Sequence, residues 1–126
     1  MLEIGLTAQS KTEVNKNNTA IALGSGDLAV FATPAMIALM ENAAMTAVAA
    51  QLEEGSTTVG TAMSASHIKA SGVGAQIIAT ATVVAFEGRK ITFKVDARDA
   101  EGVIGDGEHT RFVVDKMKFM QKVKSL

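Results

Sequence analysis

The sequence has no cysteine, tryptophan or tyrosine and only one proline. Without cysteine there is no disulfide scaffold, no thiolate metal site and no cysteine nucleophile, and the composition suits a reducing compartment such as the cytoplasm. The 4% of aromatic residues are all phenylalanine, so few side chains are suited to stacking on bases. A formal net charge of −1 provides no basic field. Together these absences argue against nucleic-acid binding.

Long apolar runs and targeting signals are also missing. No window holds the ~18 uninterrupted apolar residues of a membrane span, and the first residues lack the basic and apolar regions of a secretory signal. Hydrophobic residues make up 48% of the 126 residues and charged residues 20%, a balance that excludes intrinsic disorder. We therefore expect one domain, residues 1–126, in the cytoplasm and without a membrane segment.

The clearest local signal is the pair Thr33-Pro34, which precedes a long run rich in alanine, methionine and leucine. Threonine is a good N-cap, proline suits the first helical position, and Gly55 suits a helix C-terminus. These signals predict one helix over about residues 34–53. The helix is apolar on nearly all sides, so we expect other parts of the protein to enclose it.

The segments that follow Gly55 have the period-two alternation of half-buried strands. The tight turns between them predict an antiparallel sheet. Strands are expected over 57–69, 75–87, 90–98 and 103–120, the last with a bulge at 105–107. Ahead of the helix, we predict short strands over 10–14 and 19–23 and a helical turn over 28–31. The expected fold is α+β, with an antiparallel sheet wrapped around one long central helix.

Four residues are candidates for chemistry. Glu41 interrupts the apolar helix, where a buried carboxylate is costly unless it is paired, reaches solvent or serves a site. His67, near the end of a strand, is one of only two histidines and is either structural or functional. Thr33 is explained as an N-cap, although that position also favours anions. Gly60 within a strand marks either a bulge or the close approach of a ligand.

Other features carry less information about function. His109 lies in a charged stretch and is predicted to be a solvated surface residue. The lysines of residues 116–124 are predicted to form a solvated end, with a site for an anionic substrate tail as the alternative. The sequence has no dinucleotide fingerprint, nucleophile elbow or metal-ligand spacing. No metal and no cofactor are therefore expected.

Three short motifs, taken in order and in spacing, resemble the fluoroacetyl-CoA thioesterase-like branch of the hotdog-fold thioesterases. They are the segment from Thr33 to Glu41, then Val59-Gly60-Thr61-Ala62, then Ser66-His67. Two further matches are Glu87-Gly88-Arg89 and Lys116-Met117-Lys118-Phe119. The resemblance covers about residues 5–124. The sequence differs from the founding member of this branch around the helix, which lacks bulky aromatic residues. Selectivity for fluoroacetyl groups is therefore not expected.

The resemblance implies an acyl-CoA thioesterase that acts on a small or medium acyl group. It implies Thr33, Glu41 and His67 as the catalytic set, with Gly60 binding the acyl group. It also implies a homodimer or a dimer of dimers with acyl-CoA at the subunit interface. In chemical terms, Glu41 could attack the carbonyl or activate water, His67 could act as acid or base and bond to Glu41, and Thr33 could orient either group.

Helix geometry places a limit on this catalytic set. In a regular helix Thr33 and Glu41 lie about 12 Å apart along the axis and about 80° apart around it. Direct contact between them within one chain is not expected. Either the start of the helix is distorted, or the residues meet across a dimer interface, or they act on different parts of the substrate. We predict a site shared between subunits, which a fully active monomer would contradict.

Three other functions remain open at this point. A non-catalytic acyl-CoA or small-ligand binding domain would show saturable binding without turnover. A structural dimerisation module would place Glu41 away from any cavity. A hydratase would add water to an enoyl thioester.

Overall fold

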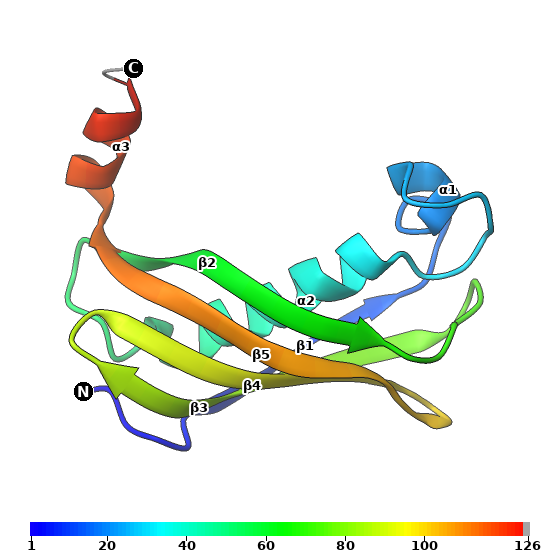
Figure 1. Ribbon diagram of the computed structural model, residues 1–126, viewed down its shortest axis with the longest axis horizontal. Helices are drawn as coiled ribbons and strands as arrows, with labels where there is room; N and C mark the ends of the chain where they lie inside the picture. The colour runs from blue at the N-terminus through cyan, green and yellow to red at the C-terminus, as the bar shows by residue number, and fades with distance from the viewer. Residues whose placement is uncertain (125–126) are drawn as a thin grey trace.

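The regular alternation of residues 90–98 belongs to the central strand of a five-stranded antiparallel sheet. In the computed structural model, which describes residues 1–124, this strand is β4 (Lys90–Asp99), and it lies between β3 (Gln76–Glu87) and β5 (Gly102–Asp115). The strand order is β1-β3-β4-β5-β2, with β1 (Thr7–Glu13) and β2 (Ser56–His67) at the edges. Figure 1 shows the sheet curving around helix α2 (Thr33–Ala49). The predicted α+β fold with a central helix is confirmed.

The core fills the space between α2 and the inner face of the sheet. Every second side chain of β4 points into it and is fully buried, as the alternation predicts. On β3 the same rule holds as far as Val83, but a bulge at Val84 then shifts the register and leaves Ala85 exposed. The buried side chains of the two strands are Ile77, Ala79, Ala81, Val83, Ile91, Phe93, Val95 and Ala97.

Helix α2 is enclosed on one side only. Its buried residues recur at helical spacing and pack against the sheet, and they are Met36, Met40, Ala43, Ala44 and Val48. Ala38 and Met45 lie on the other side and are exposed. The helix ends at Ala49, whereas the sequence predicted an end near residue 53. A single chain therefore does not supply the complete enclosure that the composition predicts.

The segment before α2 differs from its prediction. Residues 19–23 form a short helix, α1 (Ala20–Leu23), and not a strand. The hydroxyl of Thr19 accepts a hydrogen bond from Ala22 N at 3.3 Å, and Gly24 adopts a left-handed conformation with φ of 71°. These two caps stabilise the single turn. The predicted helical turn over 28–31 is also wrong, since Val30 and Phe31 form isolated β-bridges.

The C-terminal strand is shorter than predicted. β5 ends at Asp115, whose side chain accepts a hydrogen bond from Lys118 N at 3.0 Å and thereby caps helix α3 (Lys116–Lys124). Figure 1 shows α3 projecting away from the sheet. The predicted bulge also lies elsewhere, because Gly105 and Gly107 pair regularly with β4 and the extra residue is Ile104.

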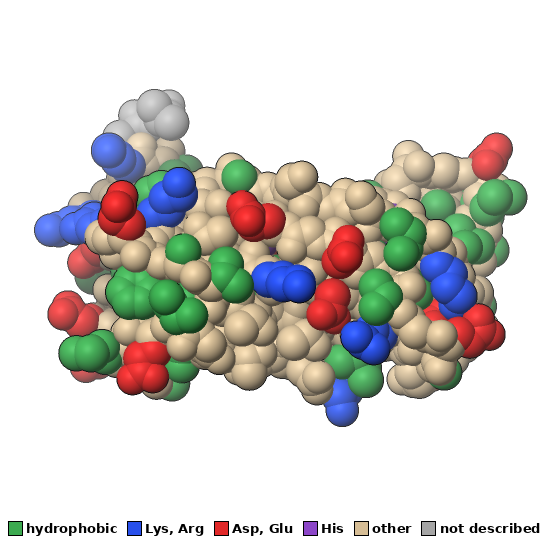
Figure 2. Space-filling view, turned by 60° about the horizontal axis from the view of Figure 1, so that its bottom comes forward, with side chains coloured by type: hydrophobic (Ala, Val, Ile, Leu, Met, Phe, Trp, Pro, Cys, Tyr) green, Lys and Arg blue, Asp and Glu red, His purple; other side chains and the backbone are tan. Residues whose placement is uncertain are grey.

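The outer face of the sheet is charged and mixed in sign. In Figure 2 the acidic and basic side chains on this face are interspersed, and neither sign forms a continuous field. No helix within residues 1–124 is long and apolar enough to cross a membrane.

Gly107 allows β2 to approach β5 closely, which gives a test of the packing. A Cβ atom at this position would overlap the backbone of Ser64 and Ala65, which cannot move without disturbing β2. We expect Gly107→Ala to lower the free energy of unfolding by about 1–3 kcal/mol, the usual cost of overpacking. Gly72→Ala is the matched control because its Cβ would meet no atom within 4 Å. Urea unfolding of both variants measures this difference, and equal stability would contradict the packing described here.

Candidate active site

Helix α2 carries two of the predicted site residues about two turns apart. Thr33 is its first residue and Glu41 lies near its middle. The helix is regular from Thr33 onward, so each side chain meets a different part of the sheet. The expectation that Thr33 and Glu41 do not touch within one chain agrees with this geometry. The structure therefore contains two separate groups of polar side chains.

The first group is a hydrogen-bonded pair formed by Thr33 and His67. Thr33 Oγ1 lies 2.8 Å from His67 Nδ1. Thr33 was expected to cap the helix, but Ala32 occupies the N-cap position and no side chain caps it. The threonine hydroxyl is therefore available to the imidazole. The pair lines a hollow of about 270 Å³ together with Ala20, Val30 and Phe31.

Two contacts position the His67 ring at the end of β2. The ring of Phe31 meets it edge-on, with centroids 6.4 Å apart and planes at 79°. Immediately after His67, the backbone N–H groups of Ile68 and Lys69 both donate to Ile104 O, at 2.7 and 3.2 Å. Within residues 1–124, the buried Nε2 atom of His67 has no hydrogen-bond partner.

Burial controls the protonation of His67. Loss of solvent lowers the pKa of its imidazole, and the nearby backbone of Lys69 opposes that change. A neutral imidazole can accept a proton from the threonine hydroxyl at Nδ1. A hydroxyl next to a neutral histidine is the arrangement found in nucleophile–base pairs.

The second group brings Glu41 together with two residues of β5. Arg111 Nη1 lies 3.4 Å from Glu41 Oε2, and His109 Nε2 lies 3.9 Å from the same oxygen. Arg111 is buried and also donates from Nε to Thr58 Oγ1 at 2.8 Å and from Nη2 to Thr58 O at 2.9 Å. Glu41 itself is 40% exposed. Its carboxylate is thus held by a buried guanidinium at the edge of the core.

The hydrogen bonds of His109 determine its tautomer. Nδ1 lies 2.7 Å from Ala62 O, which can only accept, so Nδ1 carries the proton. Nε2 is then free to accept from Arg111 Nη1 at 3.2 Å. Burial is the main cause that lowers the pKa of His109, and the positive charge of Arg111 lowers it further. The hydrogen bond to Ala62 O and the negative charge of Glu41 act in the opposite direction. The ring stacks on Phe93 with centroids 6.1 Å apart.

Gly60 leaves room for the second group. A Cβ atom at this position would lie 2.5 Å from Glu41 Oε2, 3.2 Å from His109 Cε1 and 3.3 Å from Arg111 Nη1. The strand also bulges here, because Gly60 pairs with Arg111 whereas Ala62 pairs with Thr110. The bulge, one of the two alternatives raised by the sequence, is therefore present at this glycine. The nearby atoms are side chains of the protein, so the approach of a ligand stays a prediction.

The sequence did not single out Arg111, and it misplaced His109. His109 was predicted to be solvated but is only 1% exposed. If the hairpin between β4 and β5 had no bulge, the register that pairs Val103 with Arg98 would continue along both strands. His109 would then lie opposite Thr92, on the outer face of the sheet. The extra residue Ile104 shifts the register so that His109 faces Phe93 and Arg111 faces Ile91. A histidine and an arginine two residues apart on a half-buried strand were the only available signal.

The bond that the sequence suggested between His67 and Glu41 is not present within one chain. His67 bonds to Thr33, whereas Glu41 bonds to Arg111. Among residues 1–124 no group of three His, Cys, Asp or Glu side chains is placed to hold a metal ion.

The two histidines make stability depend on pH. Both folded-state pKa values lie below the ordinary 6.5, so the unfolded chain binds protons first as the pH falls. Their contribution is complete above 6.5 and declines below it, by at most about 1.4 kcal/mol per pH unit for each proton bound. We expect urea unfolding to give a smaller free energy at about pH 5.5 than at about pH 7.5. Equal or greater stability at the lower pH would contradict the assigned burial of both imidazoles.

Comparison with known proteins places this geometry in a family. The family model for fluoroacetyl-CoA-specific thioesterases matches residues 14–117. The fluoroacetyl-CoA thioesterase of Streptantibioticus cattleyicolor is 40% identical over 95 residues, which cover 75% of this chain and 68% of that protein.

Solved structures agree with the sequence comparison. The structure of the fluoroacetyl-CoA thioesterase FlK superimposes with a TM-score of 0.93 and 32% identity, over 99% of this chain and 97% of that one. A Thermus thermophilus protein of the thioesterase superfamily shares the fold, with a TM-score of 0.91 and 24% identity over 99% and 93% of the two chains. The chain belongs to the fluoroacetyl-CoA-specific thioesterase family, and it is a hotdog-fold thioester hydrolase with acyl-CoA as its substrate class.

Proposed function

We propose that this thioesterase hydrolyses small or medium acyl thioesters of coenzyme A, with Thr33 as the nucleophile and His67 as its base. The observation that carries the proposal is the 2.8 Å contact between Thr33 Oγ1 and His67 Nδ1. A hydroxyl is a weak nucleophile until a neighbouring base removes its proton. The lowered pKa of His67 keeps the imidazole neutral and able to do so.

The reaction proceeds in two balanced steps. Thr33 Oγ1 attacks the thioester carbonyl carbon while its proton passes to His67, and the carbon–sulfur bond breaks as His67 protonates the departing thiolate sulfur. Water then attacks the acyl-threonine ester with His67 again as base, which releases the acid and restores the hydroxyl. The N–H groups of Thr33 and Ala35 in the first turn of α2 are proposed to receive the developing oxyanion, since Pro34 has no N–H and Met36 N donates to Ala32 O.

The acyl group is proposed to be small or medium in size. The hollow beside Thr33 and His67 measures about 270 Å³ and is lined by Phe31. The relatives are named for fluoroacetyl-CoA. In this chain α2 is rich in alanine and methionine and has no aromatic residue, which favours a range of acyl groups over selectivity for that one. The absence of cysteine favours the cytoplasm as its compartment.

A second copy of the chain is proposed to complete the site. Thr33 and Glu41 are about 12 Å apart along α2, too far to act on one carbonyl from the same chain. The exposed apolar side of α2, with Ala38 and Met45, also lacks a cover within one chain. In a homodimer, the second copy would bring Thr33 of one chain close to Glu41 of the other and would also cover the exposed side of α2.

The edge strand β2 is the proposed contact between the copies. It spans 12 residues without a charged residue or a proline, whereas the other edge, β1, is shorter and carries Lys11 and Glu13. Long uncharged edges invite pairing with another strand, and charged edges resist it. An antiparallel pairing of two β2 strands about a two-fold axis through Ser64, with the bulge at Thr61 kept in each copy, puts Gly60 opposite His67 of the partner subunit.

This pairing unites the two groups of polar side chains. Gly60 lies against Glu41 and Arg111, so the partner's His67 and its bonded Thr33 approach that carboxylate. Glu41 is then placed to orient the water that hydrolyses the acyl-threonine, and Gly60 lines the acyl pocket. Each dimer contains two such sites, each built from both subunits.

Thiol release from a panel of acyl-CoA substrates of increasing chain length tests the assignment. Thr33→Ala, His67→Ala and Glu41→Ala should each lower hydrolysis by a factor of about 10² or more, because each removes a group of the proposed set. The fold should survive in all three, since none of these residues belongs to the core.

Thr46→Ala is the matched control for the loss of a hydroxyl on α2. Thr46 is exposed and donates only to its own helix, at Asn42 O. It should hydrolyse acyl-CoA at about the wild-type rate. Unchanged turnover in both Thr33→Ala and His67→Ala would refute their catalytic roles.

A further inference from the structure

A short segment after β2 follows His67 directly and contacts the residues that precede Thr33. It runs from Ile68 to Gly72, directly following His67. Its Ser71 carbonyl accepts a hydrogen bond from Phe31 N at 2.9 Å, and Gly72 forms a β-bridge with Val30. Phe31 lies two residues before Thr33, so this segment holds the start of α2 as well as the end of β2.

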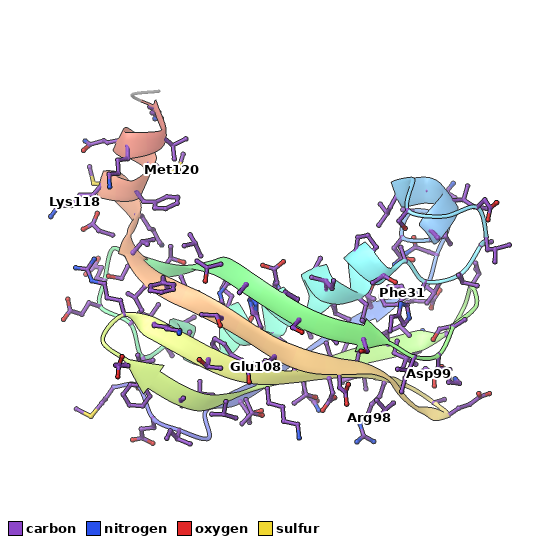
Figure 3. All side chains as sticks on the ribbon, in the orientation of Figure 1. Phe31, Arg98, Asp99, Glu108, Lys118 and Met120 are labelled. Carbon is purple, nitrogen blue, oxygen red and sulfur yellow. The ribbon has the colours of Figure 1, made fainter. Side chains whose placement is uncertain are left out.

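The segment is tied to the sheet by Asp99, the last residue of β4. Oδ2 of Asp99 accepts from Lys69 Nζ at 2.6 Å and from Ser71 Oγ at 3.0 Å. Oδ1 accepts from Glu101 N at 2.8 Å, which orients the carboxylate within the hairpin between β4 and β5. The Asp99 side chain is only 8% exposed. Figure 3 shows Asp99 and Phe31 at the same end of the molecule.

We propose that Asp99 is a positioning residue for catalysis, which fixes Thr33 and His67 relative to each other by holding residues 68–72 in place. The proposal rests on the roles given above to Thr33 and His67. Asp99 does not touch either side chain. It acts through Lys69, which follows His67 by two residues, and through Ser71, which binds the backbone of Phe31.

Geometry explains why such an anchor matters to the reaction. The bond between Thr33 and His67 joins two elements that are 34 residues apart in the chain. Proton transfer needs the two atoms within about 3.2 Å, and a displacement of about 1 Å between reacting groups can cost a factor of about 10² in rate. A carboxylate with donors on both oxygens restrains the segment more firmly than a single contact does.

The charge of Asp99 is stable over the pH range of function. Its hydrogen bond with Lys69 is the main cause that lowers its pKa to about 2, against the opposing effect of burial. The same contact raises the pKa of Lys69. The ion pair therefore persists wherever His67 is neutral.

Glu101 provides a matched control within the same hairpin. Its carboxylate also meets Lys69, at 3.0 Å, but its side chain is 78% exposed. Exposed ion pairs contribute little to structure. Glu101→Gln and Asp99→Asn each replace a carboxylate that meets Lys69 with an amide. The two residues differ because only Asp99 also binds Ser71.

The experiment compares steady-state hydrolysis by the full-length wild type, Asp99→Asn and Glu101→Gln. In Asp99→Asn an amide N–H₂ group replaces one acceptor oxygen, so kcat should fall by a factor of about 10 to 100 while KM changes by less than about threefold. In Glu101→Gln both constants should stay within about twofold of wild type. An equal loss in both variants, or an unchanged kcat in Asp99→Asn, would overturn the proposal.

Amide hydrogen exchange at Phe31 supplies a readout that does not depend on activity. Its N–H bonds to Ser71, so exchange should accelerate by a factor of about 10 or more in Asp99→Asn and remain as in the wild type in Glu101→Gln. Unchanged protection of Phe31 in Asp99→Asn would overturn the proposal. If Thr33→Ala and His67→Ala prove active, the proposed function fails, and the exchange data still decide whether Asp99 holds the segment.

Ser71→Ala covers the case in which Asp99→Asn does not fold. It keeps the ion pair between Lys69 and Asp99 and removes only the hydroxyl that Asp99 binds. It should lower kcat by a factor of about 3 to 10 and accelerate exchange at Phe31. Wild-type values of both quantities would overturn the proposal.

Discussion

The rigidity of α2 is the constraint on which the rest of the site depends. A regular helix cannot bring its first residue, Thr33, to a carboxylate that lies two turns away at Glu41. Each residue instead meets a different strand, Thr33 at His67 of β2 and Glu41 at Arg111 of β5. The proposed mechanism assigns both groups to one reaction. Their separation within one chain is the reason that a second copy is proposed to complete the site.

Two bulges determine which side chains reach the inner face of the sheet. Gly60 and His67 are seven positions apart on β2, so strict alternation would put them on opposite faces. The extra residue Thr61 restores both to the face that meets α2. On β5 the extra residue Ile104 does the same for His109 and Arg111. Each bulge costs local pairing, and in return the polar groups lie beside the helix.

These bulges mark the limit of what the sequence predicts. The alternation of β4 and the apolar run of α2 predicted the fold. A strand with one buried face has an apolar residue at every second position, and a helix that packs in the core is rich in apolar residues. Thr33, Glu41, Gly60 and His67 were all singled out by their types and spacing. Arg111 was missed and His109 was placed in solvent, since a single inserted residue reverses the face of everything after it.

In two places, helix-capping residues give a helix where the composition predicts a strand. Residues 19–23 are apolar and β-like in composition, yet Thr19 and Gly24 close them into a helical turn. Asp115 ends β5 in the same way by starting α3. The partner of Thr33 also lay beyond sequence reasoning, because its hydroxyl binds His67 and leaves the N-cap position to Ala32.

Subunit mixing tests the shared site most directly. His67→Ala and Glu41→Ala are purified separately, combined in equal amounts and allowed to exchange subunits, and thiol release is then measured. If the site takes His67 from one copy and Glu41 from the other, each mixed dimer regains one complete site, and activity should return to about a quarter of wild type. If both residues serve one site within a single chain, no mixture contains an intact site. A mixture that exchanges subunits and remains inactive would contradict the account.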